Sequence, residues 1–519
     1  MGHCEAAESA EGARHDMICV ATSRRALRSS GKHRRATARQ RKKRSFLRWG
    51  TAVNDRSPYG NYRRETMNAR TTDLKKLESY YEKSGNQMLL LYGRRGCQKE
   101  ELIKEFVKNK KHFYYRCRQA SALEQRRMMG KEIERQFDAK LQRDTYDEYF
   151  NRIKSGDPSK LVVVIDEAQY VIKKDPEFIQ SIVKLRMKRL YPGPVLILLV
   201  SSSLVWARQE AAEAFGEDAK RIDGQIEIEN YNFLEAVRAF PRTSVRDCIK
   251  IYGVLGGVPA YLDKWDETQD IRSNICRLVL SPEGALFTEA EDVIAAELRE
   301  LSVYSTILAA IARGDNKLNE LFHTTGFSRA KISVYMKNLS HFDIVEKLVS
   351  FETGGWENAK KGVYQIKDTF VNFWFKFIYP NQSDLYQMNP EQFYDTYIAP
   401  ELDAYLKRYF RDVCTEYLMI LNQMGKLPLR IHKVGTWVGK NGNIDIIAQS
   451  ADRQNMIGFC NWNQPLMTMQ MCEDMATAME QAKLNSDHYY LFSATDFEPE
   501  LKKYVTMDQR FVLIDMNEL

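Results

Sequence analysis

Eight residues between a predicted strand and a predicted helix have the composition of a phosphate-binding loop. The apolar run Met88–Tyr92 predicts a buried strand, and Glu101–Lys108 predicts a helix with one apolar face. The residues between them are Gly93, Arg94, Arg95, Gly96, Cys97, Gln98, Lys99 and Glu100. Backbone N–H groups in such a loop and at the following helix N-terminus bind phosphate oxygens. The spacing of Gly93 and Lys99 therefore predicts a nucleotide site, with an ordinary strand-to-helix turn as the alternative.

Two positions of this loop depart from the pattern G-x-x-x-x-G-K-[ST]. Gln98 replaces the second glycine, and we expect its side chain to obstruct or reshape the curl of the backbone round the phosphates. Glu100 replaces the hydroxyl residue that contacts the metal, and its carboxylate would lie close to the β-phosphate. Like charges about 4 Å apart repel by about 4 kcal/mol at an effective dielectric of about 20. Mg²⁺ bound to Glu100 could offset that repulsion. We expect binding of ATP and Mg²⁺ to be weakened or altered, not abolished.

A second apolar strand ends in two acids. Leu161–Ile165 is followed by Asp166 and Glu167. In P-loop ATPases the first acid holds Mg²⁺ and the second acts on the attacking water, which predicts a metal role for Asp166 and a catalytic role for Glu167. The alternative is an acidic helix cap after a core strand.

A third apolar strand, Val195–Val200, is followed by Ser201 and Ser202, which could sense a γ-phosphate or form a plain serine-rich turn. Continuous apolar strands separated by helices indicate a parallel sheet covered on both faces. We expect Met88–Tyr92 and Leu161–Ile165 to be neighbouring strands, so that Lys99 and Asp166 meet at one sheet edge.

The rest of the chain divides into three further regions. Residues 241–300 are rich in predicted helix, and residues 301–380 show three helices, a glycine-rich wing and a strand, the order of a winged helix. Its recognition helix would carry Arg329, Lys331 and Lys337 to DNA phosphates, or would only pack against neighbouring domains. After a linker at Asn381–Pro390, residues 391–519 form a second α/β unit. Its strands are predicted near Leu429–His432, Asn443–Ala448, Met456–Asn461 and His488–Phe492.

Together these motifs resemble the archaeal-type ATPase family, which is related to AAA+ and STAND ATPases. The resemblance runs from about residue 70 to the C-terminus. It rests on Tyr92-Gly93-Arg94-Arg95, Lys99 with Leu102-Ile103, Asp166-Glu167-Ala168-Gln169, Ser201-Ser202 and Gly256-Gly257-Val258-Pro259-Ala260-Tyr261-Leu262. It implies a multidomain α/β protein: a P-loop NTPase parallel sheet (67–240), a helical lid (241–300), a winged helix (301–380) and a C-terminal restriction-endonuclease-like α/β domain (391–519).

The same resemblance implies a nuclease-type site in the C-terminal domain, and that site is incomplete. Such sites use a helix glutamate, an aspartate and then Glu-x-Lys on the next strand. Asp445 is present, but Arg411, Phe459 and Asn461 stand at the other positions. One carboxylate holds a catalytic metal poorly. We therefore expect the fold without DNA cleavage, with Asp445 as a remnant.

Charge and cysteine usage bear on location and partners. Residues 1–66 contain 16 Lys and Arg against 6 Asp and Glu, whereas the remainder contains 61 against 63, so the basic surplus lies in the head. The head is either a disordered arm that binds nucleic acid or a mis-assigned start, with Met67 the true first residue. Nine cysteines without a CxxC pair favour a reducing cytoplasm. The absence of an apolar run of roughly 18 residues argues against a membrane span.

Three hypotheses of function follow. The leading one is an ATP-binding protein with a degenerate phosphate loop, in which the two substitutions put hydrolysis in doubt. The alternative is a non-catalytic regulator, a pseudoenzyme that binds duplex DNA, a protein partner or a second copy of itself. In a third hypothesis Glu100 serves as a metal ligand and activity survives.

Overall fold

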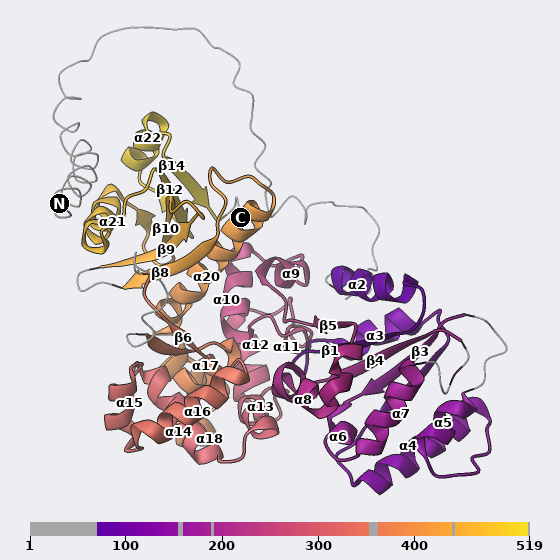
Figure 1. Ribbon diagram of the computed structural model, residues 1–519. Coiled ribbons are helices and arrows are strands. Elements are labelled where there is room, and N and C mark those ends of the chain that lie inside the picture. The colour runs from indigo at the N-terminus through magenta and orange to yellow at the C-terminus, as the bar shows by residue number, and fades with distance from the viewer. Residues whose placement is uncertain are drawn as a thin grey trace, which may run out of the picture.

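Five parallel strands form the sheet that carries the phosphate loop (Figure 1). The computed structural model describes residues 70–153, 159–187, 191, 193–351, 362–438 and 442–516, so the basic head, 1–66, lies outside the described residues. The strands are β1 (Gln87–Tyr92), β2 (His112–Arg116), β3 (Leu161–Asp166), β4 (Val195–Ser201) and β5 (Gly224–Glu227). Their order is β2-β3-β4-β1-β5, and every adjacent pair is parallel. The predicted parallel sheet is therefore confirmed.

The prediction that the first and third of these strands are neighbours is wrong. β4 lies between them, and its apolar residues pair with β1 on one side and with β3 on the other. A strand that is apolar on both faces favours the centre of a covered sheet, and all six residues of β1 and of β3 are buried as well. Because the strands are parallel, their carboxyl ends still share one edge.

Helices cover both faces of this sheet. Alternate residues of β1 point to opposite sides: Leu89 and Leu91 pack under α2 (Thr71–Glu82) and α3 (Lys99–Val107). Met88 and Leu90 face the helices on the other side. Those helices are α4 (Ala122–Phe137), α5 (Tyr146–Arg152), α7 (Pro176–Arg186) and α8 (Ala211–Phe215), with the shorter α6 (Gln169–Ile172), η2 (Trp206–Glu210) and η3 (Gly216–Arg221) beside them.

The middle of the chain is helical, with one small hairpin. The first helices are α9 (Phe233–Arg238), α10 (Val245–Leu255), α11 (Pro259–Leu262), α12 (Ile271–Ile275), η4 (Cys276–Leu280) and α13 (Glu289–Glu297). Then come α14 (Leu301–Arg313), α15 (Leu318–Thr325), α16 (Arg329–His341) and the antiparallel strands β6 (Val345–Leu348) and β7 (Val363–Ile366). Part of the expected wing, 352–361, lies outside the described residues.

The predicted linker at Asn381–Pro390 is wrong, because this stretch is mostly helical. The helices from β7 onward are α17 (Thr369–Phe373), η6 (Trp374–Ile378), η7 (Tyr379–Asn381), α18 (Gln382–Gln387), α19 (Pro390–Phe393) and η8 (Tyr394–Ile398). Leu385 of α18 is buried in the main hydrophobic core, and Gln382 donates a hydrogen bond to Glu291 of α13. Burial of an apolar side chain fixes this stretch against the core, whereas a linker would make no such contact.

The C-terminal unit is an α/β domain, as predicted, and its sheet contains both parallel and antiparallel strands. Its strands are β8 (Lys433–Val438), β9 (Asn443–Gln449), β10 (Asn455–Asn461), β12 (His488–Ser493) and β14 (Phe511–Asp515), in the order β14-β12-β10-β9-β8. β8, β9 and β10 pair antiparallel, and β10, β12 and β14 pair parallel. The remaining elements are α20 (Leu402–Gln423), β11 (Leu466–Met467), α21 (Met469–Ala482), β13 (Asp496–Phe497) and α22 (Pro499–Met507).

The strand predicted near Leu429–His432 is wrong; β8 begins at Lys433. The side chain of Asn422 satisfies the backbone of Ile431 instead: its Oδ1 accepts from Ile431 N at 2.9 Å, and its Nδ2 donates to Ile431 O at 3.3 Å. Leu429 and Ile431 are buried, so the apolar alternation reflects packing of an irregular segment.

One continuous core links the second half of the chain. Its buried residues run from Tyr231 to Met516, whereas the two cores of the five-stranded sheet contain residues from Leu77 to Ile228. α10 packs against α17 and against the long helix α20, which lie together between the two sheets (Figure 1). In the described part of the chain, every helix is too short or too polar to cross a bilayer.

Candidate phosphate-binding site

The loop between β1 and α3 makes the backbone turn that the sequence pattern requires, with glutamine in place of glycine. Gly96 has φ +84°, and Gln98, the residue before α3, has φ 62° and ψ 34°, in the left-handed region. A residue with a side chain pays about 1–2 kcal/mol for this conformation. The loop therefore keeps this left-handed backbone conformation at an energetic cost that glycine would not have.

Two side chains from the region C-terminal to β5 hold Gln98 in place. The hydroxyl of Tyr231 donates to Gln98 Oε1 at 2.6 Å, and Gln98 Nε2 donates to Asp263 Oδ2 at 3.0 Å. Gln98 is only 9% exposed. Its amide is thus hydrogen-bonded through both of its polar atoms, as a buried polar group must be, and it connects the loop to the helical region.

Lys99 closes the loop on itself. Its ammonium donates to the backbone carbonyls of Gly93 at 2.6 Å and Arg94 at 2.8 Å, and it lies 3.7 Å from Cys97 Sγ. Lys99 is buried, in spite of its charge. A phosphate that enters the loop would compete with these two carbonyls for the ammonium.

The Gly256-Gly257-Val258-Pro259 segment lies directly on the loop. The N–H of Ala260, near the start of α11, donates to Gly96 O at 3.1 Å. A Cβ on Gly257 would lie 1.8 Å from Tyr231 O, so this position accepts only glycine. The close approach explains Gly257, and a φ of +66° explains Gly256.

Arg94 links the loop to the segment that begins α17. Its Nη1 contacts Asp368 Oδ2 at 2.5 Å, and both side chains are largely buried. Burial alone would lower the pKa of Arg94, but the Asp368 carboxylate offsets it and holds that pKa above the ordinary value. Arg95, the next residue, is exposed.

Asp166 ends β3 as a buried carboxylate whose two oxygens are both hydrogen-bonded. Oδ2 accepts from the Tyr114 hydroxyl at 2.7 Å, and Oδ1 accepts from Glu167 N at 3.0 Å. Burial raises the pKa of Asp166, and the neighbouring Glu167 adds to that rise, while the Tyr114 hydrogen bond opposes it. The predicted metal ligand therefore already has partners from the protein.

Arg116 lies between the two residues predicted to bind metal. Its Nη1 donates to Glu100 Oε1 at 2.6 Å, and its Nε lies 3.6 Å from Asp166 Oδ2. Arg116, the last residue of β2, is not among the site residues predicted from the sequence. The available signal was a basic residue at the carboxyl end of a strand, on the same sheet edge as Asp166.

These contacts decide how well the residues fit Mg²⁺. Glu100 and Asp166 both bind a guanidinium, and the described residues contain no group of three or more His, Cys, Asp or Glu side chains that could hold a metal ion. Mg²⁺ requires a near-octahedral set of oxygens, and a positive charge beside those oxygens opposes its entry. As arranged here, the residues do not fit the metal.

Glu167 is held by Ser202, the residue that follows β4. The Ser202 hydroxyl lies 2.6 Å from both carboxylate oxygens, and Gln169 Nε2 donates to Oε2 at 2.6 Å. Gly93 N donates to Ser201 O at 3.2 Å. The structure therefore brings together, at one sheet edge, the loop, the acidic strand end and the serines that the sequence predicted.

Asp445, the expected remnant of a nuclease-type site, lies in the C-terminal sheet, away from the loop of residues 93–100. Asp445 Oδ2 accepts from Cys460 N at 3.0 Å; burial raises the pKa of Asp445, and the positive charges of Lys407 and Arg411 oppose that rise. Asn461 Nδ2 is bonded to Gln464 O, Ser493 Oγ and Thr495 Oγ1.

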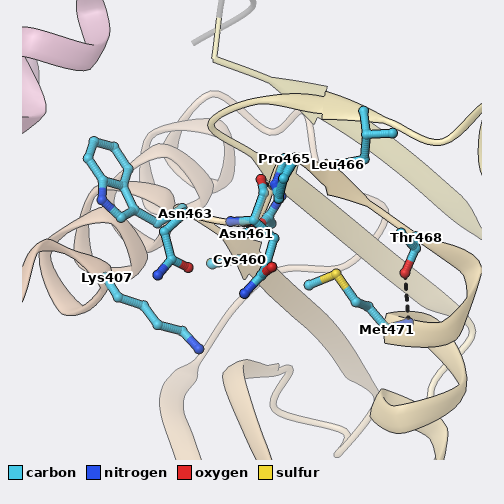
Figure 2. Close-up of a pocket in the computed structure, with 10 residues that line it drawn as sticks. Lys407, Cys460, Asn461, Asn463, Pro465, Leu466, Thr468 and Met471 are labelled. Atoms are coloured by element: carbon cyan, nitrogen blue, oxygen red, sulfur yellow. Dashed lines mark hydrogen bonds between the residues drawn. The ribbon is translucent and has the colours of Figure 1, made fainter. Parts of the chain in front are cut away.

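A cavity of about 500 Å³ opens beside Asn461, with Lys407 reaching toward it from α20 (Figure 2). None of the described residues that line it is Asp or Glu. A metal-dependent cleavage site needs carboxylate ligands, so this cavity lacks that chemistry.

Comparisons with known proteins agree with this architecture. Residues 68–265 match a family described as "ATPase domain predominantly from Archaea", and residues 374–475 match one described as "Archaea bacterial proteins of unknown function". A Methanocaldococcus jannaschii protein, "Uncharacterized protein MJECL04", is 28% identical over 388 residues, which cover 73% of this chain and 83% of that protein. Residues 68–265 therefore form a domain of the archaeal ATPase type.

Two solved structures can be aligned with more than half of this chain. The Walker-type ATPase PABY2304 of Pyrococcus abyssi is 16% identical with a TM-score of 0.43, and the alignment covers 62% of this chain and 99% of that one. The ORC2 protein of Aeropyrum pernix, in ADPNP–ADP complexes, is 14% identical with a TM-score of 0.40, covering 63% of this chain and 98% of that one.

Proposed function

We propose that this chain binds ATP or ADP in the loop of residues 93–100 and turns ATP over slowly or not at all. The observation that carries the proposal is the loop itself, which keeps its left-handed turn into α3 although glycine has been replaced by Gln98. A strand, such a turn and a helix N-terminus form an anion site. The ATPase family match supports the same ligand.

The proposed roles follow from position. The loop amides and Lys99 bind the phosphates, and Glu167 is the residue placed to act on an attacking water. Glu167 is hydrogen-bonded to Ser202 and Gln169. A general base engaged in this way is less available to accept a proton, which supports slow turnover.

A thermal-shift titration of the full chain with ATP and with ADP, each with and without Mg²⁺, tests the proposal. A ligand at 100 times its Kd stabilises the folded state by about 2.7 kcal/mol, so a clear rise in melting temperature is expected. Lys99→Met should reduce that rise, whereas Lys104→Met, on the exposed side of α3, should not. Absence of any shift with millimolar ATP or ADP would reject nucleotide binding.

A second candidate function, as a DNA-binding or protein-binding regulator, has one specific observation in its favour. Arg329 and Lys337 are exposed on α16, the helix in the position of a recognition helix. Arg329 also lies over the Phe322 ring and donates to Asn319, which suits a packing role equally. Salt-dependent mobility shift of duplex DNA, lost in Arg329→Ala/Lys337→Ala, tests it. In either case we propose domain limits near residues 240, 300 and 380.

A further inference from the structure

Arg116 has the position and the free capacity to supply the positive charge that a nucleotide site needs. In P-loop NTPases the hydroxyl residue of the loop and the first acid of the second strand hold the metal ion. In this chain those positions are Glu100 and Asp166, and the Arg116 guanidinium contacts both. A cationic group of the protein therefore lies between the side chains where a metal ion would be held.

The Arg116 side chain is also open to a ligand. It is 52% exposed, and a guanidinium has more N–H donors than its contacts to Glu100 and Asp166 use. Planar guanidinium groups bind phosphate oxygens through paired hydrogen bonds, which are strong because both partners are charged. Arg116 can thus keep its carboxylate partners and donate toward the loop.

We propose that Arg116 replaces the divalent cation, so that this site binds nucleoside diphosphates or triphosphates free of metal. The inference rests on the proposed nucleotide site and specifies the form of its ligand. Magnesium bound between Glu100 and Asp166 would have to displace the guanidinium from both. Free nucleotide meets no such competitor, and its greater negative charge suits the arginine.

The test compares nucleotide affinity of the full chain with and without metal. Isothermal titration with ADP and with ATP is done in excess EDTA and again in excess Mg²⁺. The expected result is binding in EDTA at least as tight as in Mg²⁺. Binding only in Mg²⁺ would overturn the inference and leave the nucleotide site standing, whereas no binding in either condition would reject both.

Arg116 variants separate the arginine from the loop. Arg116→Ala should weaken binding in EDTA about tenfold, equivalent to about 1.4 kcal/mol, and should make binding stronger in Mg²⁺ than in EDTA. Arg116→Lys, which keeps the charge, should lose less. Arg118→Ala is the matched control, because Arg118 is exposed two residues further along. Unchanged binding in Arg116→Ala, with a melting temperature showing an intact fold, would overturn the role of Arg116.

Discussion

Arg94 of the phosphate loop and Asp368, 274 residues later, form a largely buried ion pair with an Nη1–Oδ2 distance of 2.5 Å. The other oxygen of Asp368 accepts from Val371 N and caps α17. The Asp368 carboxylate thus binds the loop through Arg94 and also caps the N-terminus of α17, whose buried residues belong to the core of the second half of the chain. Any change in the loop backbone at Arg94 acts on α17 through this contact.

Asp368→Asn is expected to lower the free energy of unfolding by about 2–3 kcal/mol, because it leaves the Arg94 charge largely buried without its partner. Asparagine can still cap α17, so the loss reports the ion pair rather than the cap. Urea denaturation measures it. Asp395→Asn, which breaks the exposed pair with Arg272, is the control and should change stability little. Equal effects of the two substitutions would contradict the importance of burial.

Gln98→Gly and Gln98→Ala should differ in stability by about 1 kcal/mol in favour of glycine. Both variants lose the hydrogen bonds to Tyr231 and Asp263, so that cost cancels in the comparison. Only alanine keeps the strain of the left-handed backbone at φ 62°. Chemical denaturation of the two proteins measures the difference, and equal midpoints and slopes would show that the turn relaxes without glycine.

Gln98→Gly combined with Glu100→Thr should raise Mg²⁺-dependent ATP turnover above that of the natural chain. The double change restores the glycine and the metal-binding hydroxyl of the loop and removes one carboxylate partner of Arg116. Adding Glu167→Gln should then lower turnover by about 10²–10⁴-fold, the usual contribution of a general base. A steady-state phosphate-release assay measures both steps. A fall in turnover on the double change would instead support Glu100 as a working metal ligand.

Stability should fall as the pH rises from about 4.5 toward 7 because of Glu416 on α20. Burial raises the pKa of Glu416 to about 7, although hydrogen bonds from Phe233 N and the Tyr252 hydroxyl lower it. The negative charges of Asp412 and Glu235 add to the rise. A carboxyl group whose pKa is higher in the folded than in the unfolded protein binds its proton more tightly when folded. Its contribution to the free energy of unfolding is therefore complete below the unfolded pKa and is lost as the pH rises through the folded pKa. The loss is on the order of 3 kcal/mol.

Glu416→Gln should remove this part of the pH dependence, measured as unfolding free energy in urea from about pH 3.5 to about pH 8, about one unit beyond each end of the window. Tyr252→Phe removes a hydrogen bond that favours the carboxylate, so it should move the loss of stability to higher pH. A pH profile of Glu416→Gln that follows the natural chain would show that another group causes the dependence.

Local sequence patterns predicted the parts of the fold that depend on local chemistry. Continuous apolar runs placed β1, β3 and β4 within a residue or so of their observed ends, because strands buried on both faces leave no polar position. The order of those strands in the sheet could not be predicted, because all three runs are equally apolar and none of them is marked as the central strand. The irregular backbone at Ile431 was missed for a similar reason: Asn422 satisfies it from nine residues away.

The candidate site shows the same division. Gly93, Lys99, Asp166 and Ser202 were found because each stands at a fixed offset from a strand end. Contacts made across long sequence distances could not be predicted in this way. Those contacts include Asp263 with Gln98 and Asp368 with Arg94, which depend on how the helical region packs against the loop.

The core that joins the helices after Tyr231 to one face of the C-terminal sheet has a consequence for how this chain can change over evolutionary time. The C-terminal sheet packs against α20, and α20 packs against α10, which in turn contacts α17. Deleting the sheet would therefore expose apolar side chains of α20, the helix on which α10 packs. Selection for a stable helical region would then be enough to retain the C-terminal unit, whatever chemistry that unit itself performs.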